Sequence, residues 1–275
     1  MARTTTPDDL TIHPREIAFG REEGFPRWWH GNDPVPTAFY NALSVTFPLG
    51  ERFFMDAVRY YKKQTPKALQ AQITAFVSQE AMHSREHVFF NRQVTSHGYD
   101  ITAMEARVKF RTTIARKLPH AMQLAATAAL EHFTAIMAHA ILSNPAHMEG
   151  VTKEAQRMWR WHAMEEIEHK AVAFDTLIAA VKGGPLGRWA LRSWAMFVTT
   201  ILFTYTITRN VWEFFDQDCI NTPRTWGRLL AYLWDKPGLV RAIAGSYLSY
   251  YRPGFHPWQE DDRALIAPMQ AEYAA

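Results

Sequence analysis

The sequence predicts an all-α protein, and two features of its 275 residues carry that prediction. Prolines and glycines divide the chain into long segments in which apolar residues recur with helical spacing and rarely alternate as they would in a half-buried strand. Hydrophobic residues make up 48% of the chain and charged residues 21%, which supplies a packed core and leaves too little net charge for disorder. We therefore expect one helical core with appendages.

The expected helices begin and end at these breaks. Three prolines between Pro26 and Pro36 make residues 1–40 look irregular. Proline costs no hydrogen bond in the first turn of a helix, so Pro66 and the segment after Pro119 are good helix starts, and Thr102 with Glu105 has the spacing of a capping box. We expect helices at about 48–63, 66–97, 102–117, 119–143 and 151–182, and at least two more in 186–215 and 224–251.

No linker interrupts the chain, so a single domain is expected. We expect a mobile, irregular N-terminal arm at 1–40, one helical domain at 41–255 and an irregular C-terminal tail at 256–275. The first residues lack the apolar core of a signal peptide, which favours a cytoplasmic protein. Cys219 is the only cysteine, which excludes an intrachain disulfide and a thiolate metal cage and is typical of a reducing compartment.

The charge of the chain argues against a nucleic-acid partner. It has 30 basic and 27 acidic residues, a formal net charge of +3, and no run of basic residues. Residues 193–208 carry no charge, but a helix of that length is about 24 Å long and falls short of the roughly 30 Å hydrocarbon core of a bilayer. We therefore expect no stable membrane insertion. This helix is interpreted as a cover for the core or a homodimer interface, with an apolar substrate channel or a lipid-contacting surface as the alternatives.

Histidine is concentrated in one part of the chain, where nine of the twelve lie between His83 and His169. Two of them close a Glu-x-x-His pattern, in Glu80–His83 and Glu166–His169. Residues i and i+3 share a helix face, so each pair can offer one carboxylate and one imidazole to a single metal ion. The sequence thus predicts metal ligands on two helices.

Each of these two helices is preceded by a helix with one further candidate glutamate, Glu51 and Glu131. Four carboxylates in one apolar core would be strongly unfavourable if unpaired. Two divalent ions supply a charge of +4 against −4, which makes residues 41–255 a predicted metal-binding domain. Alone, Glu51 could equally be a first-turn carboxylate favoured by the helix dipole.

The order Glu, Glu-x-x-His, Glu, Glu-x-x-His resembles the ferritin-like di-iron carboxylate proteins, whose ligands project into a four-helix bundle. More narrowly, the segments FPLGERFF, FVSQEAMHSREHVFFN and WHAMEEIEHKAVAFD are similar to the family of predicted metal-dependent hydrolases over roughly residues 40–250. The resemblance implies a ferritin-like four-helix bundle with additional C-terminal helices. It also implies two metal ions, iron in the first place, with manganese or a mixed Fe/Mn pair as options.

Neighbouring acidic and histidine residues have plainer interpretations. Glu165 competes with Glu166 because it lies four residues before His169, but the i, i+3 spacing favours Glu166. Asp175 is a candidate acceptor for an imidazole N–H. We expect three glutamates to be solvated or adjacent to the ligands: Glu86, Glu165 and Glu168. Five histidines are expected to be structural or at the surface: His97, His120, His132, His139 and His147.

Two more histidines lie one helical turn from a predicted ligand. His87 follows His83 and His162 precedes Glu166, so each can reach an ion if its side chain leans along the helix. The pattern H-x-x-x-E-x-x-H resembles di-iron N-oxygenases that use a third histidine. We therefore favour His162 as a third nitrogen ligand and keep His87 as its rival, with hydrogen bonding alone as the third option.

The predicted function is an enzyme that activates O2 at a di-iron centre and oxidises a small, apolar organic substrate. The alternative is a metal-dependent hydrolase in which a metal-bridging hydroxide attacks the substrate. A third option is a non-enzymatic iron-binding protein, for which the aromatic C-terminal helices are unnecessary. The ligand pattern does not identify the electron donor that an oxidase needs.

Overall fold

The computed structural model describes residues 5–21 and 24–273. Within these residues the regular secondary structure is entirely helical, which confirms the predicted class. A single isolated bridge between His30 and Val151 is the only extended pairing in the described chain.

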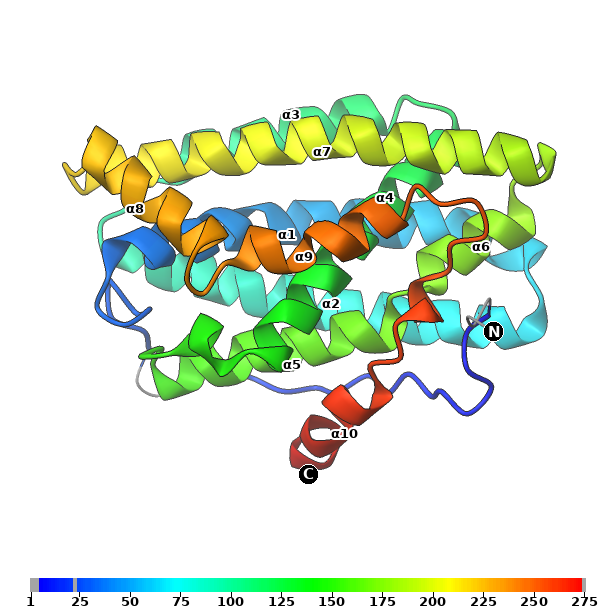
Figure 1. The fold of residues 1–275 in the computed structure, drawn as a ribbon, viewed down its shortest axis with the longest axis horizontal. Helices are drawn as coiled ribbons and strands as arrows, with labels where there is room; N and C mark the ends of the chain where they lie inside the picture. Colours follow the sequence, from blue (N-terminus) through cyan, green and yellow to red (C-terminus); the bar gives the residue numbers. More distant parts are fainter. Residues whose placement is uncertain (1–4, 22–23, 274–275) are drawn as a thin grey trace.

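Four helices form the centre of the molecule. They are α1 (Pro34–Tyr61), α2 (Lys67–Ser96), α4 (His120–Ser143) and α5 (Lys153–His169). α1 packs on α2 and on α4, and α5 packs on α4 and on α2, so that the four helices enclose a common interior. In Figure 1 α4 crosses the others obliquely, and α3 (Thr102–Ala115) lies in the long connection between α2 and α4. This is the predicted four-helix core, while its kinship with ferritin-like bundles stays a prediction.

The start of α1 was predicted wrongly. The helix begins at Pro34 and not near Pro48, which lies inside it. Asp33 ends the preceding turn, and its side-chain oxygen accepts a hydrogen bond from the Val35 N–H at 2.9 Å. Pro34 and Pro36 then occupy the first turn, where proline loses no hydrogen bond. The cluster of prolines that suggested an irregular arm is therefore a helix start.

Two further local predictions were wrong. The expected helix at 151–182 is divided into α5, which ends at His169, and α6 (Val172–Ala180). At this break the Lys170 ammonium donates to the Asp262 carboxylate at 2.5 Å and to the Glu260 carbonyl at 2.8 Å. Thr102 also does not cap α3, because its N–H donates to the Asp100 carboxylate at 2.8 Å.

The two ends of the chain are more ordered than predicted. The N-terminal arm runs along the core and buries Ile12, Phe19, Phe25 and Trp29, so it is packed and not a free arm. The C-terminal tail contains α10 (Arg263–Glu272), which packs on α5. The arm and α10 therefore both pack on α5.

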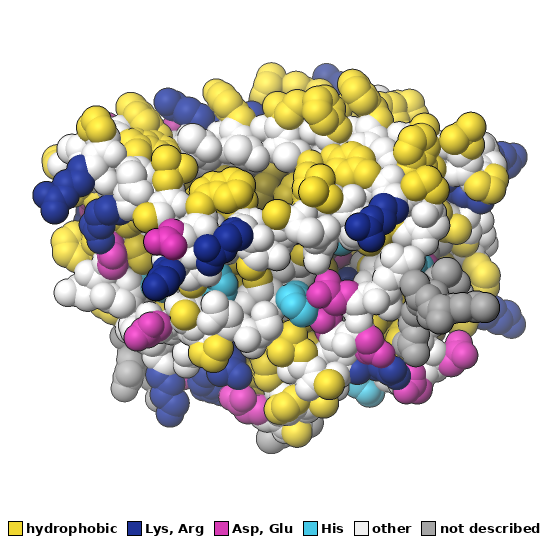
Figure 2. Space-filling view, in the orientation of Figure 1, with side chains coloured by type: hydrophobic (Ala, Val, Ile, Leu, Met, Phe, Trp, Pro, Cys, Tyr) yellow, Lys and Arg dark blue, Asp and Glu magenta, His cyan; other side chains and the backbone are white. Residues whose placement is uncertain are grey.

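The remaining helices, α7 (Gly184–Gln217), α8 (Pro223–Trp234) and α9 (Leu239–Ser249), cover the opposite side of the core. Among the residues that the structure describes, two helices are long and apolar enough to cross a membrane, α4 and α7. The most apolar window of α4 is 78% buried and that of α7 only 28%. α7 therefore covers the core with one face only. Its other face exposes Trp194, Phe197, Ile201 and Tyr205. Figure 2 shows hydrophobic side chains along the upper edge of the molecule, where α7 lies in Figure 1.

Replacing Asp33 tests the start of α1. Asp33→Ala removes the acceptor for the Val35 N–H and should lower the free energy of unfolding by about 1 kcal/mol. Asp33→Asn keeps a capping oxygen and should change it by less than about 0.5 kcal/mol, because the exposed ion pair with Arg228 contributes little. Urea unfolding measures both. Equal losses in the two variants would show that the ion pair, and not the cap, stabilises this end.

Candidate metal centre

The four central helices bring all eight predicted ligands into their common interior. α1 supplies Glu51, α4 supplies Glu131, α2 supplies three residues and α5 supplies three. No residue of the set is more than 4% exposed. The residues on α2 and α5 are Glu80, His83, His87, His162, Glu166 and His169.

The carboxylates and imidazoles lie at close range. His169 Nε2 is 3.1 Å from Glu80 Oε1, 3.4 Å from Glu131 Oε2 and 3.5 Å from Glu166 Oε2. On the other side, His83 Nδ1 is 3.7 Å from Glu80 Oε1 and 3.6 Å from Glu166 Oε1. Glu80 and Glu166 thus lie between the two histidines.

Glu51 belongs to the His83 side of the cluster. Its carboxylate falls in one potential ligand group with Glu80 and His83, while Glu131 falls in another with Glu80 and His169. Two overlapping ligand groups that share Glu80 are the arrangement expected for two ions side by side. That these residues bind metal stays a prediction.

The atoms that face this interior lack hydrogen-bond partners among the described residues. They are fully buried, and a buried polar atom without a partner costs about 1–3 kcal/mol or more when charged. Six predicted ligands contribute such atoms: Glu51 Oε1, Glu80 Oε1 and Oε2, His83 Nδ1, Glu131 Oε2, Glu166 Oε2 and His169 Nε2. A pair of bound cations would satisfy all of them, so the residues present fit a dinuclear centre.

Electrostatics show the same demand for positive charge. Burial raises the pKa of Glu131 to about 8 and that of Glu51 well above its usual value, and the neighbouring Glu80 carboxylate adds to both shifts. At His83 and His169 burial acts to lower the pKa, but the surrounding carboxylates outweigh it. The pKa of His83 rises to about 10 and that of His169 well above its usual value.

At Glu80 and Glu166 the balance has the opposite sign. Burial acts to raise the pKa of each, but the adjacent imidazoles outweigh it and the net shift is downward. Two protonated carboxyl groups and two imidazolium ions then accompany two carboxylates. These four bound protons carry the same charge as two divalent ions, so metal and protons are alternative ways to balance the cluster.

In His83 and His169, the ring nitrogen that points away from the carboxylate cluster contacts another buried side chain. His83 Nε2 lies 3.1 Å from Glu165 Oε2, and His169 Nδ1 lies 3.0 Å from Gln79 Oε1. Because a neutral imidazole has one N–H, donation outward leaves Nδ1 of His83 and Nε2 of His169 free to bind metal. Glu165 is therefore a partner of a ligand and not the alternative to Glu166.

Arg15 links the two side chains that contact these histidines, Glu165 directly and Gln79 through Glu168. This role of Arg15 was not predicted from the sequence. Its guanidinium donates to Glu165 at 3.1 Å and, through two N–H groups, to Glu168 at 2.9 and 2.8 Å. Glu168 also accepts from Gln79 at 2.7 Å. One arginine of the N-terminal arm thus holds the groups that orient both histidines.

The expectation that nearby acidic residues are solvated was wrong in part. Glu86, Glu165 and Glu168 are fully buried, and each is paired with arginine. Glu86 accepts from Arg21, from Arg85 and from the Phe19 N–H. Glu165 lies beside the predicted ligand His83, as the other half of the expectation stated, whereas Glu86 and Glu168 attach the arm to α2 and α5.

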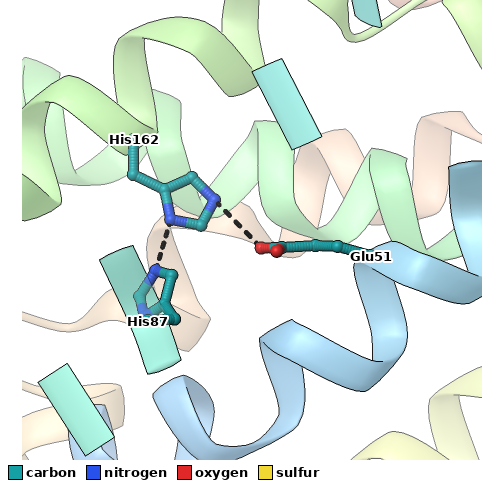
Figure 3. Close-up of side chains that lie close together, drawn as sticks. All are labelled: Glu51, His87 and His162. Carbon is teal, nitrogen blue, oxygen red and sulfur yellow. Dashed lines mark hydrogen bonds and ion pairs between the residues drawn. The ribbon is translucent and has the colours of Figure 1, made fainter. Parts of the chain in front are cut away.

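His162 faces the carboxylates and His87 lies behind it (Figure 3). The Ser44 hydroxyl donates to Asn91 at 2.7 Å, so its oxygen accepts from His87 Nδ1 at 2.9 Å. His87 then offers an unprotonated Nε2 to His162 Nδ1 at 2.6 Å. His162 must donate there, which leaves its Nε2 as a lone pair 2.8 Å from Glu166 Oε1.

A lone pair facing a carboxylate oxygen at this distance needs a shared proton or a cation. Burial lowers the pKa of His162, with the charge of His83 as the next cause. Burial also lowers the pKa of His87 well below its usual value, and the neighbouring His162 lowers it further. The geometry therefore favours His162 over His87 as the third nitrogen ligand, as the sequence predicted. Ligation itself stays a prediction.

The remaining histidines lie outside this cluster, as expected. His132 Nε2 bonds the Ser246 carbonyl at 3.1 Å, and His120 stacks on Tyr60 at the surface. His97 bonds the Phe25 carbonyl. Asp175 was predicted to bond an imidazole beside the metal ligands. It does bond an imidazole, but that of His256, at 3.0 Å, and not that of a predicted ligand.

One other group of potential ligands lies near the surface, formed by His139, Glu260 and Asp262. Asp262 there bonds His139 at 2.7 Å and Lys170 at 2.5 Å. The ammonium already balances this carboxylate, so the group needs no ion.

The family model of the predicted metal-dependent hydrolases matches residues 13–261. Among curated proteins and among solved structures, none is significantly similar to the chain. The matched region contains the arm from His13, all four central helices and α7 to α9. It supports a metal-dependent enzyme, and it agrees with the alternative prediction of a hydrolase better than with the predicted oxidation by O2.

Replacing Arg15 tests the support of the two histidines. Arg15→Gln leaves Glu165 and Glu168 buried without their cation and should lower the free energy of unfolding by about 3 kcal/mol. Arg263→Gln is the control, because its pairs with Asp9 and Asp261 are exposed and should contribute less than about 1 kcal/mol. Urea unfolding compares the two. Similar losses would mean that the buried network does not stabilise the fold.

Proposed function

We propose that this chain, which belongs to the predicted metal-dependent hydrolase family, is a hydrolase with a dinuclear metal centre inside its four-helix core. The buried, partnerless atoms of six residues carry this proposal. We assign as ligands Glu51, Glu80, His83, Glu131, Glu166 and His169, with His162 as a third nitrogen donor. Whether the native ions are iron, manganese or both follows from metal analysis.

Bound ions would supply Lewis-acid catalysis by polarising a substrate oxygen and acidifying water. The chain itself supplies a small space beside the centre, lined by Glu166, His162, Phe47 and Trp159. Its volume of about 30 Å³ suits roughly one water molecule. The Glu166 carboxylate would accept a hydrogen bond from that water and orient it, while the two aromatic rings exclude bulk solvent.

Hydrolysis of an ester serves as the model reaction. The water oxygen bonds to the acyl carbon, the bond from that carbon to the leaving oxygen breaks, and one proton of the water ends on the leaving group. No oxidant or reductant is consumed. The chain's part is to position the water and to hold the carboxylates that bind the ions.

Oxidation of an organic substrate by O2 is the second candidate, and the ligand set favours it. A carboxylate-rich set with two or three imidazoles suits iron or manganese, the metals that react with O2 in such sites. An external electron donor would then be required.

Assays under argon separate the two functions. We expect metal-loaded protein to release p-nitrophenol from p-nitrophenyl esters in the absence of O2, and metal-free protein to lose this activity. Turnover that appears only with O2 and a reductant, with matching O2 uptake, would instead establish the oxidase. A protein that binds metal and does neither on a broad panel of substrates would leave the non-enzymatic iron-binding option.

Replacement of Glu131 should reduce the number of bound metal ions. Glu131 is the ligand that α4 provides. Glu131→Ala should lower the metal content from two ions per chain to at most one, measured by elemental analysis. Glu105→Ala, an exposed glutamate on α3, is the control and should leave the content unchanged. Retention of both ions by the Glu131 variant would contradict the assigned ligand set.

Cobalt(II) substitution tests the third histidine. His162→Ala should change the visible spectrum of the cobalt protein and weaken one site by at least about tenfold, since one nitrogen donor is lost. His132→Ala, another buried histidine, should alter neither property. A large spectral change in His87→Ala together with none in His162→Ala would reverse the assignment of the two.

A further inference from the structure

A large apolar cavity lies between the core and the C-terminal helices. It has a volume of about 430 Å³, within the range of small-molecule sites. Side chains from α1, α4, α7, α8 and α9 line it, among them Phe133, Phe203, Ile207, Leu233 and Ile243. Figure 2 shows hydrophobic side chains around the hollow between α7 and α9.

This cavity meets the small space beside the metal centre. Leu43, Met137 and Leu239 line both of them. The small space in turn touches Glu166 and His162. A molecule in the large cavity would therefore lie next to the small space, at the side that these three residues form. Methionine is unbranched and adapts easily, so Met137 can move aside at low cost.

The lining also restricts the chemistry of an occupant. No charged side chain lines the cavity among the described residues. Two of its polar groups already satisfy each other, because the Thr200 hydroxyl lies 3.0 Å from the Tyr247 hydroxyl, which in turn lies 2.9 Å from that of Tyr251. An ionised or strongly polar body would lose its hydration here without replacement.

We propose that the cavity binds the apolar body of the substrate and directs its single polar, reacting group through the Leu43–Met137–Leu239 neck toward Glu166 and His162. The substrate class is thus a small, uncharged hydrophobic molecule with one hydrolysable group at its end. This inference rests on the proposed function for the reaction, and on the cavity alone for the binding. It also gives α7, α8 and α9 a role that a metal site by itself does not require.

The binding step is tested with 1-aminoanthracene, an apolar polycyclic probe whose fluorescence rises when it leaves water. We expect saturable binding of one probe per chain in the full-length protein. Thr204→Trp places a large side chain into the cavity from an exposed position on α7, and should weaken binding at least tenfold. Thr208→Trp fills the same cavity one turn further along the helix and should act likewise, which guards against misfolding of a single variant.

Ile201→Trp is the matched control, because Ile201 is exposed on the same helix and does not line the cavity. It should bind the probe as the unaltered protein does, and all variants should keep their metal content and thermal unfolding midpoint. Absence of saturable binding, or equal weakening by all three substitutions, would overturn the proposal.

Metal analysis on the same samples keeps the two ideas apart. Probe binding that Thr204→Trp weakens, in a chain that takes up no metal, would support the cavity assignment and overturn the proposed centre. Two bound ions without probe binding would do the reverse. With both present, p-nitrophenyl hexanoate should compete with the probe, and p-nitrophenyl acetate should compete more weakly. Equal competition would overturn the assignment of the apolar body to this cavity.

Discussion

The burial of four glutamates in one helical interior is the constraint on which the rest of the structure depends. Each unpaired carboxylate would cost several kcal/mol, so the fold must supply positive charge where α1, α2, α4 and α5 meet. Two imidazoles and bound protons can supply it, and two divalent ions can replace those protons. One carboxylate comes from each of four helices. The packing of these helices against one another therefore depends on balancing the charge of the centre.

A second group of buried charged residues connects the centre to the N-terminal arm. Arg15 balances Glu165 and Glu168, which hold His83 directly and His169 through Gln79. The arm is therefore part of the support of the centre, although it contributes none of the assigned ligands. Orientation of the imidazoles and docking of residues 13–21 depend on the same hydrogen bonds.

Sequence reasoning could predict what depends on local periodicity. The i, i+3 spacing placed Glu80 with His83 and Glu166 with His169 on shared faces, and the apolar pattern placed α2 and α4 nearly to the residue. It could not predict Arg15, whose partners lie 150 and 153 positions away. It also misjudged α1, because a proline within a helix and a proline before one look alike until the neighbouring packing is known.

The C-terminal helices show why composition alone left several roles open. The uncharged stretch of α7 favoured a core cover or a subunit interface, with a channel wall as an alternative, since each of these roles requires apolar side chains. In the structure one face of α7 lines the cavity that reaches Leu43 and Met137, while the other is exposed. A helix that only covered the core would pack against it without leaving a hollow of this size. In our proposal, the space between α7, α8 and α9 therefore links the aromatic third of the chain to the chemistry of the centre.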